Sequence, residues 1–318
     1  MMIGGGCANG SGQKPTTRPA GGLERFEYVQ VHMGVRARLV VYAKDEERAV
    51  EGCSAAYRRV AELEQICTDY RKSSELMQLC AKAGGPAVRV SDELFCVIQK
   101  SVEASRNSGG AFDITVGPYV ALWREARRTG KMPAREEIEK ARELVGYQKI
   151  ILDPAAQTVR LTMPGMKLDL GGIAKGYAGD CALAVLKSYG IDSALFEAGG
   201  DIVVSDAPPG KYGWEIEVVN DRPSAKPKLL FMKNAGISTS GDTEQHVVIE
   251  GKRYSHVVDP RSGIALTNRN YVTITAPNGI TSDALSTTAC VLGAEETKFV
   301  LRKYPGTRAY FAPEIEGE

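Results

Sequence analysis

The sequence lacks the features that mark several large classes of protein. It has no apolar run of the roughly 18 residues that a membrane-spanning helix requires. Its 40 lysines and arginines nearly balance its 39 aspartates and glutamates, so no overall basic charge indicates nucleic-acid binding. Neither phosphate-binding fingerprint, G-x-x-x-x-G-K-[ST] or G-x-G-x-x-G, is present. The 43% hydrophobic and 25% charged composition is instead typical of a globular protein.

Paired cysteine motifs are also absent, because none of the seven cysteines are spaced C-x-x-C. This argues against a zinc site and against a thioredoxin-like motif. Cys67 and Cys80 could form a disulfide in an oxidising compartment, and the sequence leaves this open. Four others lie in apolar helical patterns and are predicted to be core thiols: Cys53, Cys96, Cys181 and Cys290.

Hydrophobic periodicity predicts both helices and strands. Short turns between the strands predicted within 193–276 require antiparallel pairing. We therefore predict an α+β fold, with helices packed on a largely antiparallel sheet, as one domain over 23–313 followed by a tail, 314–318. Strands are predicted at 25–31, 37–43, 88–90, 149–152, 158–162, 193–197, 202–205, 214–219, 228–233, 246–250 and 271–276, with a strand-like run into a turn at 112–118. Helices are predicted at 46–66, 74–80, 91–107, 133–145, 173–189, 282–292 and 295–303.

The first 22 residues are rich in glycine and predict a disordered tether. Residues 3–7, I-G-G-G-C, end like the cleavage box of a bacterial lipoprotein, but a basic start and an apolar region are missing. Two interpretations follow. Either the first residue falls within a longer signal peptide, or Cys7 is a chance cysteine in a flexible tail.

The segment 168–180, L-D-L-G-G-I-A-K-G-Y-A-G-D, is the most informative part of the chain. Here a short apolar run ends in two glycines, followed by Lys175 and a helical pattern. Glycines let a backbone approach a ligand closely, and a helix start offers free N–H groups and a positive dipole end. Together with Lys175 they predict an anion-binding site, most naturally for a phosphate. The spacing alone also fits a plain tight turn.

Other unusual segments accompany this glycine-rich junction. They are F-D-I-T-V-G-P-Y at 112–119, E-A-G-G-D at 197–201, I-S-T-S-G-D at 237–242, S-H-V-V-D-P-R-S-G at 255–263 and S-D-A-L-S-T-T-A at 282–289. In these motifs and their order, from about residue 24 to 308, the chain resembles the ApbE family, the FAD:protein FMN transferases. The resemblance implies a single α+β domain of the T-fold-like kind, with the flavin in a central cleft.

Asp283 and Thr287 are four residues apart on a predicted helix and share one face. With a backbone carbonyl they would make an all-oxygen site, which suits Mg²⁺. On the residues alone, a first-turn aspartate and a core threonine are the simpler interpretation. The resemblance favours the metal site, because the family's D-x-x-x-T pair binds Mg²⁺ with a carbonyl that falls here on Gly172.

The resemblance also implies contacts with FAD. Tyr70 stands where the family places an aromatic residue over the flavin, and Lys175 matches a position that contacts the FAD. Ala111, Phe112 and Asp113 align with further FAD contacts. Without the family, Asp113 would be a helix or turn cap and Tyr70 a half-buried packing residue.

His256, one of three histidines, lies in a segment that resembles the family's H-x-x-D-P motif. Histidine can take a proton from an attacking hydroxyl, which would make His256 catalytic together with Asp283. Equally, it could only position the flavin or pair with Asp259, which we expect to stabilise the Pro260 turn or orient His256. His256 and Val257 are also expected to contact the FAD. Nearby, Thr243 replaces an aromatic residue found in many relatives.

The function implied by the resemblance is Mg²⁺-dependent transfer of FMN from FAD to a Thr or Ser hydroxyl of an acceptor protein, with release of AMP. One alternative is an FAD pyrophosphatase that gives FMN and AMP. Another is a non-enzymatic flavin-binding lipoprotein, although the presence of Asp283 and Thr287 argues against it. The expected partner is an acceptor flavoprotein with a Thr-containing flavinylation motif, such as a subunit of a membrane redox pump.

Location is inferred from the family alone. Many relatives are periplasmic lipoproteins, so we expect the periplasm or the outer face of the cell membrane. The only membrane attachment we expect is a lipid anchor at Cys7.

Overall fold

The computed structural model describes residues 22–218, 228–241, 246–268 and 271–312. Within these residues the centre is a seven-stranded sheet in the order β1-β2-β6-β7-β10-β13-β14, with every neighbouring pair antiparallel. The strands are β1 (Glu24–His32), β2 (Val35–Ala43), β6 (Ser193–Ala198), β7 (Asp201–Val204), β10 (Ala235–Ser240), β13 (Val272–Ala276) and β14 (Arg308–Phe311). The predicted antiparallel α+β architecture is confirmed.

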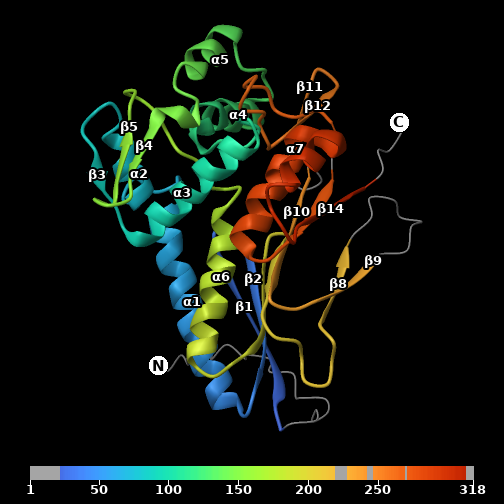
Figure 1. Ribbon diagram of the computed structural model, residues 1–318. Helices are drawn as coiled ribbons and strands as arrows, with labels where there is room; N and C mark the ends of the chain where they lie inside the picture. Colours follow the sequence, from blue (N-terminus) through green and yellow to red (C-terminus); the bar gives the residue numbers. More distant parts are fainter. Residues whose placement is uncertain (1–21, 219–227, 242–245, 269–270, 313–318) are drawn as a thin grey trace, which may run out of the picture.

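Three helices cover one face of this sheet: α1 (Glu46–Cys67), α6 (Ala174–Ser188) and α7 (Gly279–Leu301) (Figure 1). Alternate residues of β2 point toward them, so Leu39 and Val41 are fully buried against α1 and α6. The residue between these two, Val40, faces the other side. There it packs beneath the hairpin of β8 (Trp214–Val218) and β9 (Lys228–Met232).

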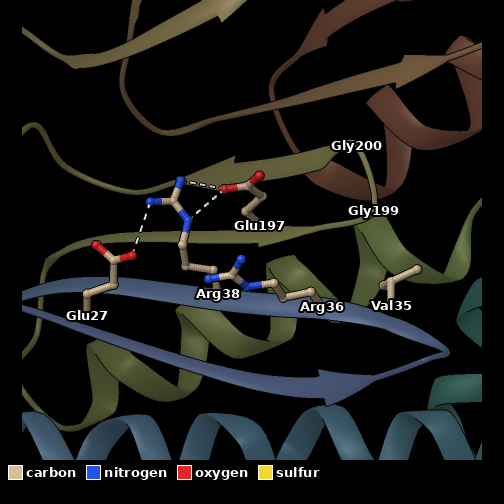
Figure 2. Close-up of a pocket in the computed structure, with 7 residues that line it drawn as sticks. All are labelled: Glu27, Val35, Arg36, Arg38, Glu197, Gly199 and Gly200. Carbon is tan, nitrogen blue, oxygen red and sulfur yellow. Dashed lines mark hydrogen bonds and ion pairs between the residues drawn. The ribbon is translucent and has the colours of Figure 1, made fainter. Parts of the chain in front are cut away.

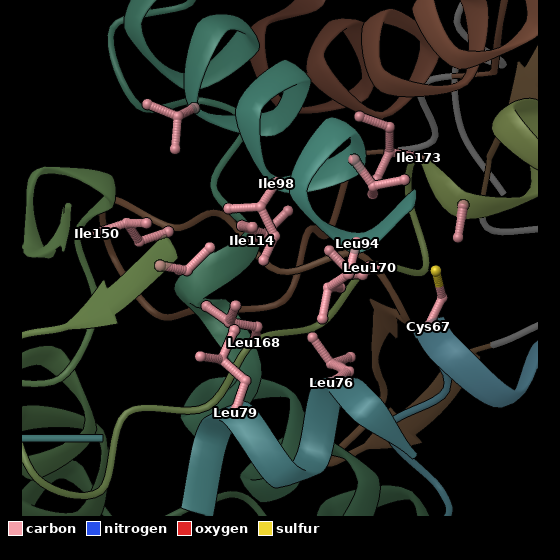
Figure 3. Close-up of a cluster of buried hydrophobic side chains, with 14 of the residues drawn as sticks. Cys67, Leu76, Leu79, Leu94, Ile98, Ile114, Ile150, Leu168, Leu170 and Ile173 are labelled. Atoms are coloured by element: carbon pink, nitrogen blue, oxygen red, sulfur yellow. The ribbon is translucent and has the colours of Figure 1, made fainter. Parts of the chain in front are cut away.

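A second core lies beside the sheet, at the side of the glycine-rich junction. It gathers residues of α2 (Glu75–Ala81), of α3 (Asp92–Asn107), and of a small sheet made by β3 (Val88–Arg89), β5 (Thr158–Leu161) and β4 (Ile150–Asp153). Leu168 and Leu170 of the junction are buried in this core, as Figure 3 shows. The junction is therefore anchored by hydrophobic side chains just before its two glycines.

A third cluster surrounds Trp123. It joins α4 (Gly117–Thr129) and α5 (Arg135–Arg142) to β11 (His246–Ile249), β12 (Lys252–Ser255) and the loop that follows β12. The Trp123 indole N–H donates to the carbonyl of Gly263 at 2.9 Å. Two short 3₁₀ helices, η1 (Ile114–Val116) and η2 (Tyr147–Lys149), complete the described elements.

The prediction for 112–118 is wrong. This segment forms η1 and then enters α4, with Asp113 as the N-cap of η1 and Pro118 in the first turn of α4. Helix α4 itself was not predicted, and neither were β10, β12 and β14. The two predicted C-terminal helices correspond to the two parts of α7 on either side of Gly293, which has φ 74° and ψ −179°, although α7 ends at Leu301, two residues before the end of the second predicted helix.

Among the described cysteines, Cys67 and Cys80 are both free thiols, so the disulfide considered between them is not formed here. Cys53 and Cys290 are buried as predicted. Cys96 and Cys181 are only partly buried.

Some expectations lie outside the described residues. These include Cys7, nearly all of the 1–22 tether, Thr243 and the 314–318 tail. In the part of the chain that is described, no helix has the length and apolarity needed to cross a membrane.

The second core should be a main source of stability. Leu94 is fully buried there, so Leu94→Ala should lower the free energy of unfolding by about 2–5 kcal/mol, measured by urea denaturation. As a control, Val31→Ala on β1 removes a side chain that is 76% exposed and should change this free energy by less than about 0.5 kcal/mol. Equal effects of the two variants would contradict this assignment of the core.

Candidate functional site

Helices α6 and α7 cross at two glycines, Gly176 and Gly279. A Cβ atom added to Gly176 would lie 2.1 Å from the carbonyl oxygen of Gly279. One added to Gly279 would lie 2.4 Å from the carbonyl oxygen of Gly176. Any side chain would therefore force the helices apart, and only glycine permits this approach.

At this crossing, each helix accepts hydrogen bonds from the first turn of the other. The Asp283 carboxylate of α7 accepts from the Gly176 N–H at 2.9 Å. The Asp180 carboxylate of α6 accepts from the N–H groups of Gly279 at 2.7 Å and Ile280 at 2.9 Å. Both carboxylates thus satisfy N–H groups that lack partners within their own helix.

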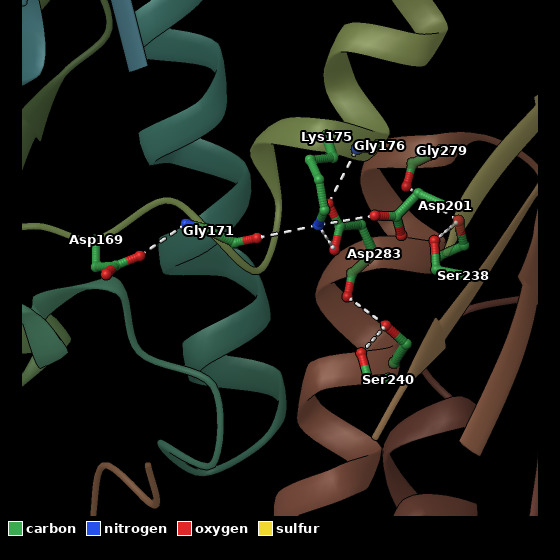
Figure 4. A network of polar contacts seen from close by, with 11 residues as sticks. Asp169, Gly171, Lys175, Gly176, Asp201, Ser238, Ser240, Gly279 and Asp283 are labelled. Atoms are coloured by element: carbon green, nitrogen blue, oxygen red, sulfur yellow. Dashed lines mark hydrogen bonds and ion pairs between the residues drawn. The ribbon is translucent and has the colours of Figure 1, made fainter. Parts of the chain in front are cut away.

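Strand β10 holds α7 from the other side. The hydroxyl of Ser238 lies 2.8 Å from that of Ser282, and the hydroxyl of Ser240 lies 2.7 Å from that of Ser286. These hydroxyl pairs flank Asp283 along α7, so its carboxylate is held between α6 and the sheet (Figure 4).

Lys175 lies among oxygen atoms from three segments, as Figure 4 shows. Its Nζ is 2.8 Å from Asp201 Oδ2 and 3.8 Å from Asp283 Oδ1, and it donates to the Gly171 carbonyl at 3.3 Å. Asp201 follows the Gly199–Gly200 turn, whose φ values of 55° and 90° favour glycine. We call Lys175, Asp201 and Asp283 the lysine cluster.

The electrostatics of the lysine cluster are unbalanced, because one ammonium group faces two carboxylates. Burial, and after it the neighbouring Asp201 carboxylate, raise the pKa of Asp283 to about 7, and Lys175 offsets only part of the rise. Burial alone would lower the pKa of Lys175, but Asp201 and Asp283 outweigh it and the pKa is raised. The lysine is therefore charged at neutral pH, and the carboxyl groups of the site outnumber its ammonium group.

The predicted metal ligands Gly172, Asp283 and Thr287 come together. Thr287 follows Asp283 by one turn of α7, and a Cβ on Gly172 would lie 2.8 Å from Thr287 Oγ1. The described residues hold no group of three His, Cys, Asp or Glu suited to a metal. A carboxylate, a hydroxyl and a carbonyl, beside a cluster with two carboxyl groups for one ammonium group, nevertheless fit a hard divalent cation such as Mg²⁺.

Tyr70 is 78% exposed, so the alternative that it is a half-buried packing residue is wrong. The guanidinium of Arg124 lies over its ring, 4.4 Å from the ring centre. Arg124 also binds the carboxylates of Asp69 and Asp169. The sequence did not indicate Arg124 or Asp169, because a charged helix and a lone aspartate carry no specific signal.

Ala111, Phe112 and Asp113 are buried, with exposures of 1%, 4% and 6%. The Asp113 carboxylate accepts from the backbone N–H of Thr115 at 2.8 Å and of Tyr147 at 2.7 Å. Burial raises the pKa of Asp113, and these bonds offset part of the rise. In this conformation Asp113 is a turn cap, and contact of the three residues with FAD remains a prediction.

His256 is exposed on the loop after β12, next to the partly exposed Val257. The loop is held by a bridge between Val258 and Ala265. Asp259 accepts from the backbone N–H of Arg261 at 2.9 Å and binds its guanidinium, so it stabilises the turn as expected. The roles of His256 and Val257 remain predictions.

A pocket of about 590 Å³ lies on the face of the sheet away from α1 and α6 (Figure 2). Gly199 and Gly200, which line this pocket, form the turn that precedes Asp201 of the lysine cluster. None of the residues expected to bind FAD or metal lines it. Arg38 in this pocket is already paired with Glu27 and Glu197. We therefore assign the candidate site to the lysine cluster and its surroundings.

Comparison with known proteins decides the family. A sequence model of the ApbE family matches residues 33–311. The chain belongs to the ApbE family. It is 31% identical to a Klebsiella pneumoniae protein named FAD:protein FMN transferase, over 90% of this chain and 88% of that protein. It is 29% identical to a Treponema pallidum protein of the same name, over 91% and 84%.

The fold agrees with that of solved members of the ApbE family. The crystal structure of the Pseudomonas stutzeri flavinyl transferase ApbE in its apo form superposes with a TM-score of 0.82. It is 26% identical, and the match covers 93% of this chain and 92% of that one. The predicted family, enzyme class and α+β fold are confirmed.

Because a partly buried carboxylate of α6 caps the first turn of α7, the stability of the protein should depend on pH. Burial raises the pKa of Asp180 to about 6, although bonds from Ile280 and Gly279 offset part of the rise. An unfolded aspartate loses its proton near pH ~4, so between about pH 4 and 6 the folded state binds more protons. The free energy of unfolding of the wild type, relative to Asp180→Asn, should therefore fall by about 2–3 kcal/mol over that range and level off above it.

Urea denaturation of both proteins across this pH range measures the difference. Asp153→Asn, which replaces an exposed carboxylate at the end of β4, serves as the matched control. A difference between wild type and Asp180→Asn that stays constant with pH would refute the raised pKa.

Proposed function

We propose that this ApbE family protein transfers FMN from FAD to a Thr or Ser hydroxyl of an acceptor protein and releases AMP. The observation that carries the proposal is the lysine cluster beside the glycine-rich junction. There, Lys175 and the start of α6 lie next to an oxygen-rich site formed by Gly172, Asp283 and Thr287. The names of the curated relatives support the same reaction.

The reaction exchanges a phosphoanhydride bond of FAD for a phosphoester bond to the acceptor. The acceptor oxygen forms a bond to the phosphorus on the FMN side of the pyrophosphate, and the bond from that phosphorus to the bridging oxygen breaks. AMP leaves with the bridging oxygen, and the hydroxyl proton passes to a base, for which the exposed His256 is the candidate. Such transfers depend mainly on positioning and charge neutralisation.

The protein's own groups can supply part of this neutralisation. The Lys175 ammonium is charged and the α6 start contributes the positive end of its dipole. Gly172, Asp283 and Thr287 would hold Mg²⁺, which when bound neutralises charge on the pyrophosphate oxygens. The excess of carboxylate over ammonium in the lysine cluster supports this assignment.

We also propose that the acceptor is a flavoprotein with a Thr-containing flavinylation motif, such as a membrane redox-pump subunit. This protein itself we place in the periplasm or at the outer face of the cell membrane. The family resemblance supports this. Lipid attachment at Cys7 belongs to the same proposal.

A single incubation tests the reaction. The purified protein is mixed with FAD, Mg²⁺ and an acceptor domain that carries a Thr-containing motif, and a Thr→Val acceptor serves as the control. We expect the intact mass of the acceptor to increase by one FMN, with one AMP released for each. AMP and free FMN without added mass would favour the pyrophosphatase, and bound FAD without AMP would favour a flavin-binding protein.

Asp283 should be required for this transfer. Asp283→Asn keeps the size of the side chain but removes the carboxylate that would hold Mg²⁺ beside Lys175, so the rate of flavinylation should fall by at least about 100-fold. The far-UV circular dichroism should be unchanged. Asp153→Asn should transfer at the wild-type rate, and transfer at that rate by Asp283→Asn with Mg²⁺ present would remove Asp283 from the site.

A further inference from the structure

Arg124 joins three segments that are far apart in the sequence. One end of its guanidinium binds Asp69, in the loop after α1, and the other end lies 3.2 Å from Asp169 in the glycine-rich junction. The plane between them lies over the ring of Tyr70, 4.4 Å from its centre. A single side chain thus contacts two carboxylates and one aromatic face.

Asp169 and helix α4 have contacts that do not involve Arg124. Asp169 donates its backbone N–H to the Ile114 carbonyl at 2.8 Å, and its carboxylate accepts from the Gly171 N–H at 2.8 Å. Helix α4 is held by Trp123, which is 1% exposed and bonded to Gly263. Removing the Arg124 side chain should therefore leave the backbone at Asp169 and helix α4 in place.

Tyr70, in contrast, has few other restraints. Its side chain is largely exposed, and its backbone N–H donates to Thr68 Oγ1 at 3.2 Å. Arg124 is the described group that covers its ring. Loss of Arg124 should consequently free the Tyr70 side chain more than any other part of the site.

The arrangement requires arginine in particular. Burial alone would lower the pKa of Arg124, but Asp69 and Asp169 outweigh it and the pKa is raised. A guanidinium can bind two carboxylates in its plane while it stacks on a ring, whereas a lysine ammonium can do only part of this.

We propose that Arg124 is a positioning residue that holds the Tyr70 ring in the orientation in which it stacks on the flavin end of FAD. This inference rests on the proposed function, because it takes FAD as the substrate. Arg124 acts through Tyr70 and determines affinity for the flavin end, while the lysine cluster serves the phosphate end.

The test compares Arg124→Lys and Arg124→Gln with matched changes at Arg128. Arg128 lies on the same helix, pairs with Glu125 and has a side chain that is 72% exposed. Affinities for FAD and FMN are measured by flavin fluorescence, and affinity for ADP by calorimetry. Both Arg124 variants should bind FAD and FMN about tenfold more weakly, while ADP affinity and the Arg128 variants stay at wild-type values.

A double-mutant cycle with Tyr70→Ala checks that the effect passes through Tyr70. If Arg124 acts through this ring, adding Arg124→Gln to Tyr70→Ala should cause no further loss of FMN affinity. Additive losses, equal losses for ADP and FMN, or wild-type flavin affinity in Arg124→Gln would each overturn the inference. If flavin affinity depends on Arg124 but the protein transfers no FMN, the proposed function would be wrong and the inference about Arg124 would stand.

Discussion

The close crossing of α6 and α7 is the constraint on which the candidate site depends. Gly176 and Gly279 let the two backbones meet, and the carboxylates of Asp180 and Asp283 each accept N–H groups from the opposite helix. Since Lys175 precedes Gly176 directly, this geometry also brings its ammonium group to Asp283. The lysine cluster is therefore a consequence of how two helices pack.

The same crossing places two carboxyl groups at positions where burial disfavours their ionised forms. Burial raises the pKa values of both Asp180 and Asp283, so their ionised forms are unfavourable in the folded state. Hydrophobic packing on either side offsets this cost, with α1 and α6 on the large sheet and the second core behind the junction. A rigidly held site in which two carboxyl groups face one ammonium group is well suited to bind a cation and a pyrophosphate together.

The sequence predicted those parts of the site that depend on local pattern. The glycine-rich junction, Lys175 and the Asp283–Thr287 spacing are visible as motifs, and alternating residues predicted most strands of the sheet. Other parts depend on distant contacts. Arg124 lies in the charged run W-R-E-A-R-R, which did not predict helix α4, and its carboxylate partners lie in distant segments. Strand β10 is short and rich in hydroxyl groups, and its serines bond to α7. Asp113 belongs to a motif that predicts contact with FAD, yet in this conformation its carboxylate serves as a turn cap.

The exchange of caps between the helices can be measured directly by amide hydrogen exchange, followed by NMR at Gly176, Gly279 and Ile280. The account predicts that Asp180→Asn accelerates exchange at Gly279 and Ile280 and leaves Gly176 protected. It predicts the reverse for Asp283→Asn. If either variant loosens all three amides equally, or none of them, then the two carboxylates do not hold the crossing and the site must be organised in another way.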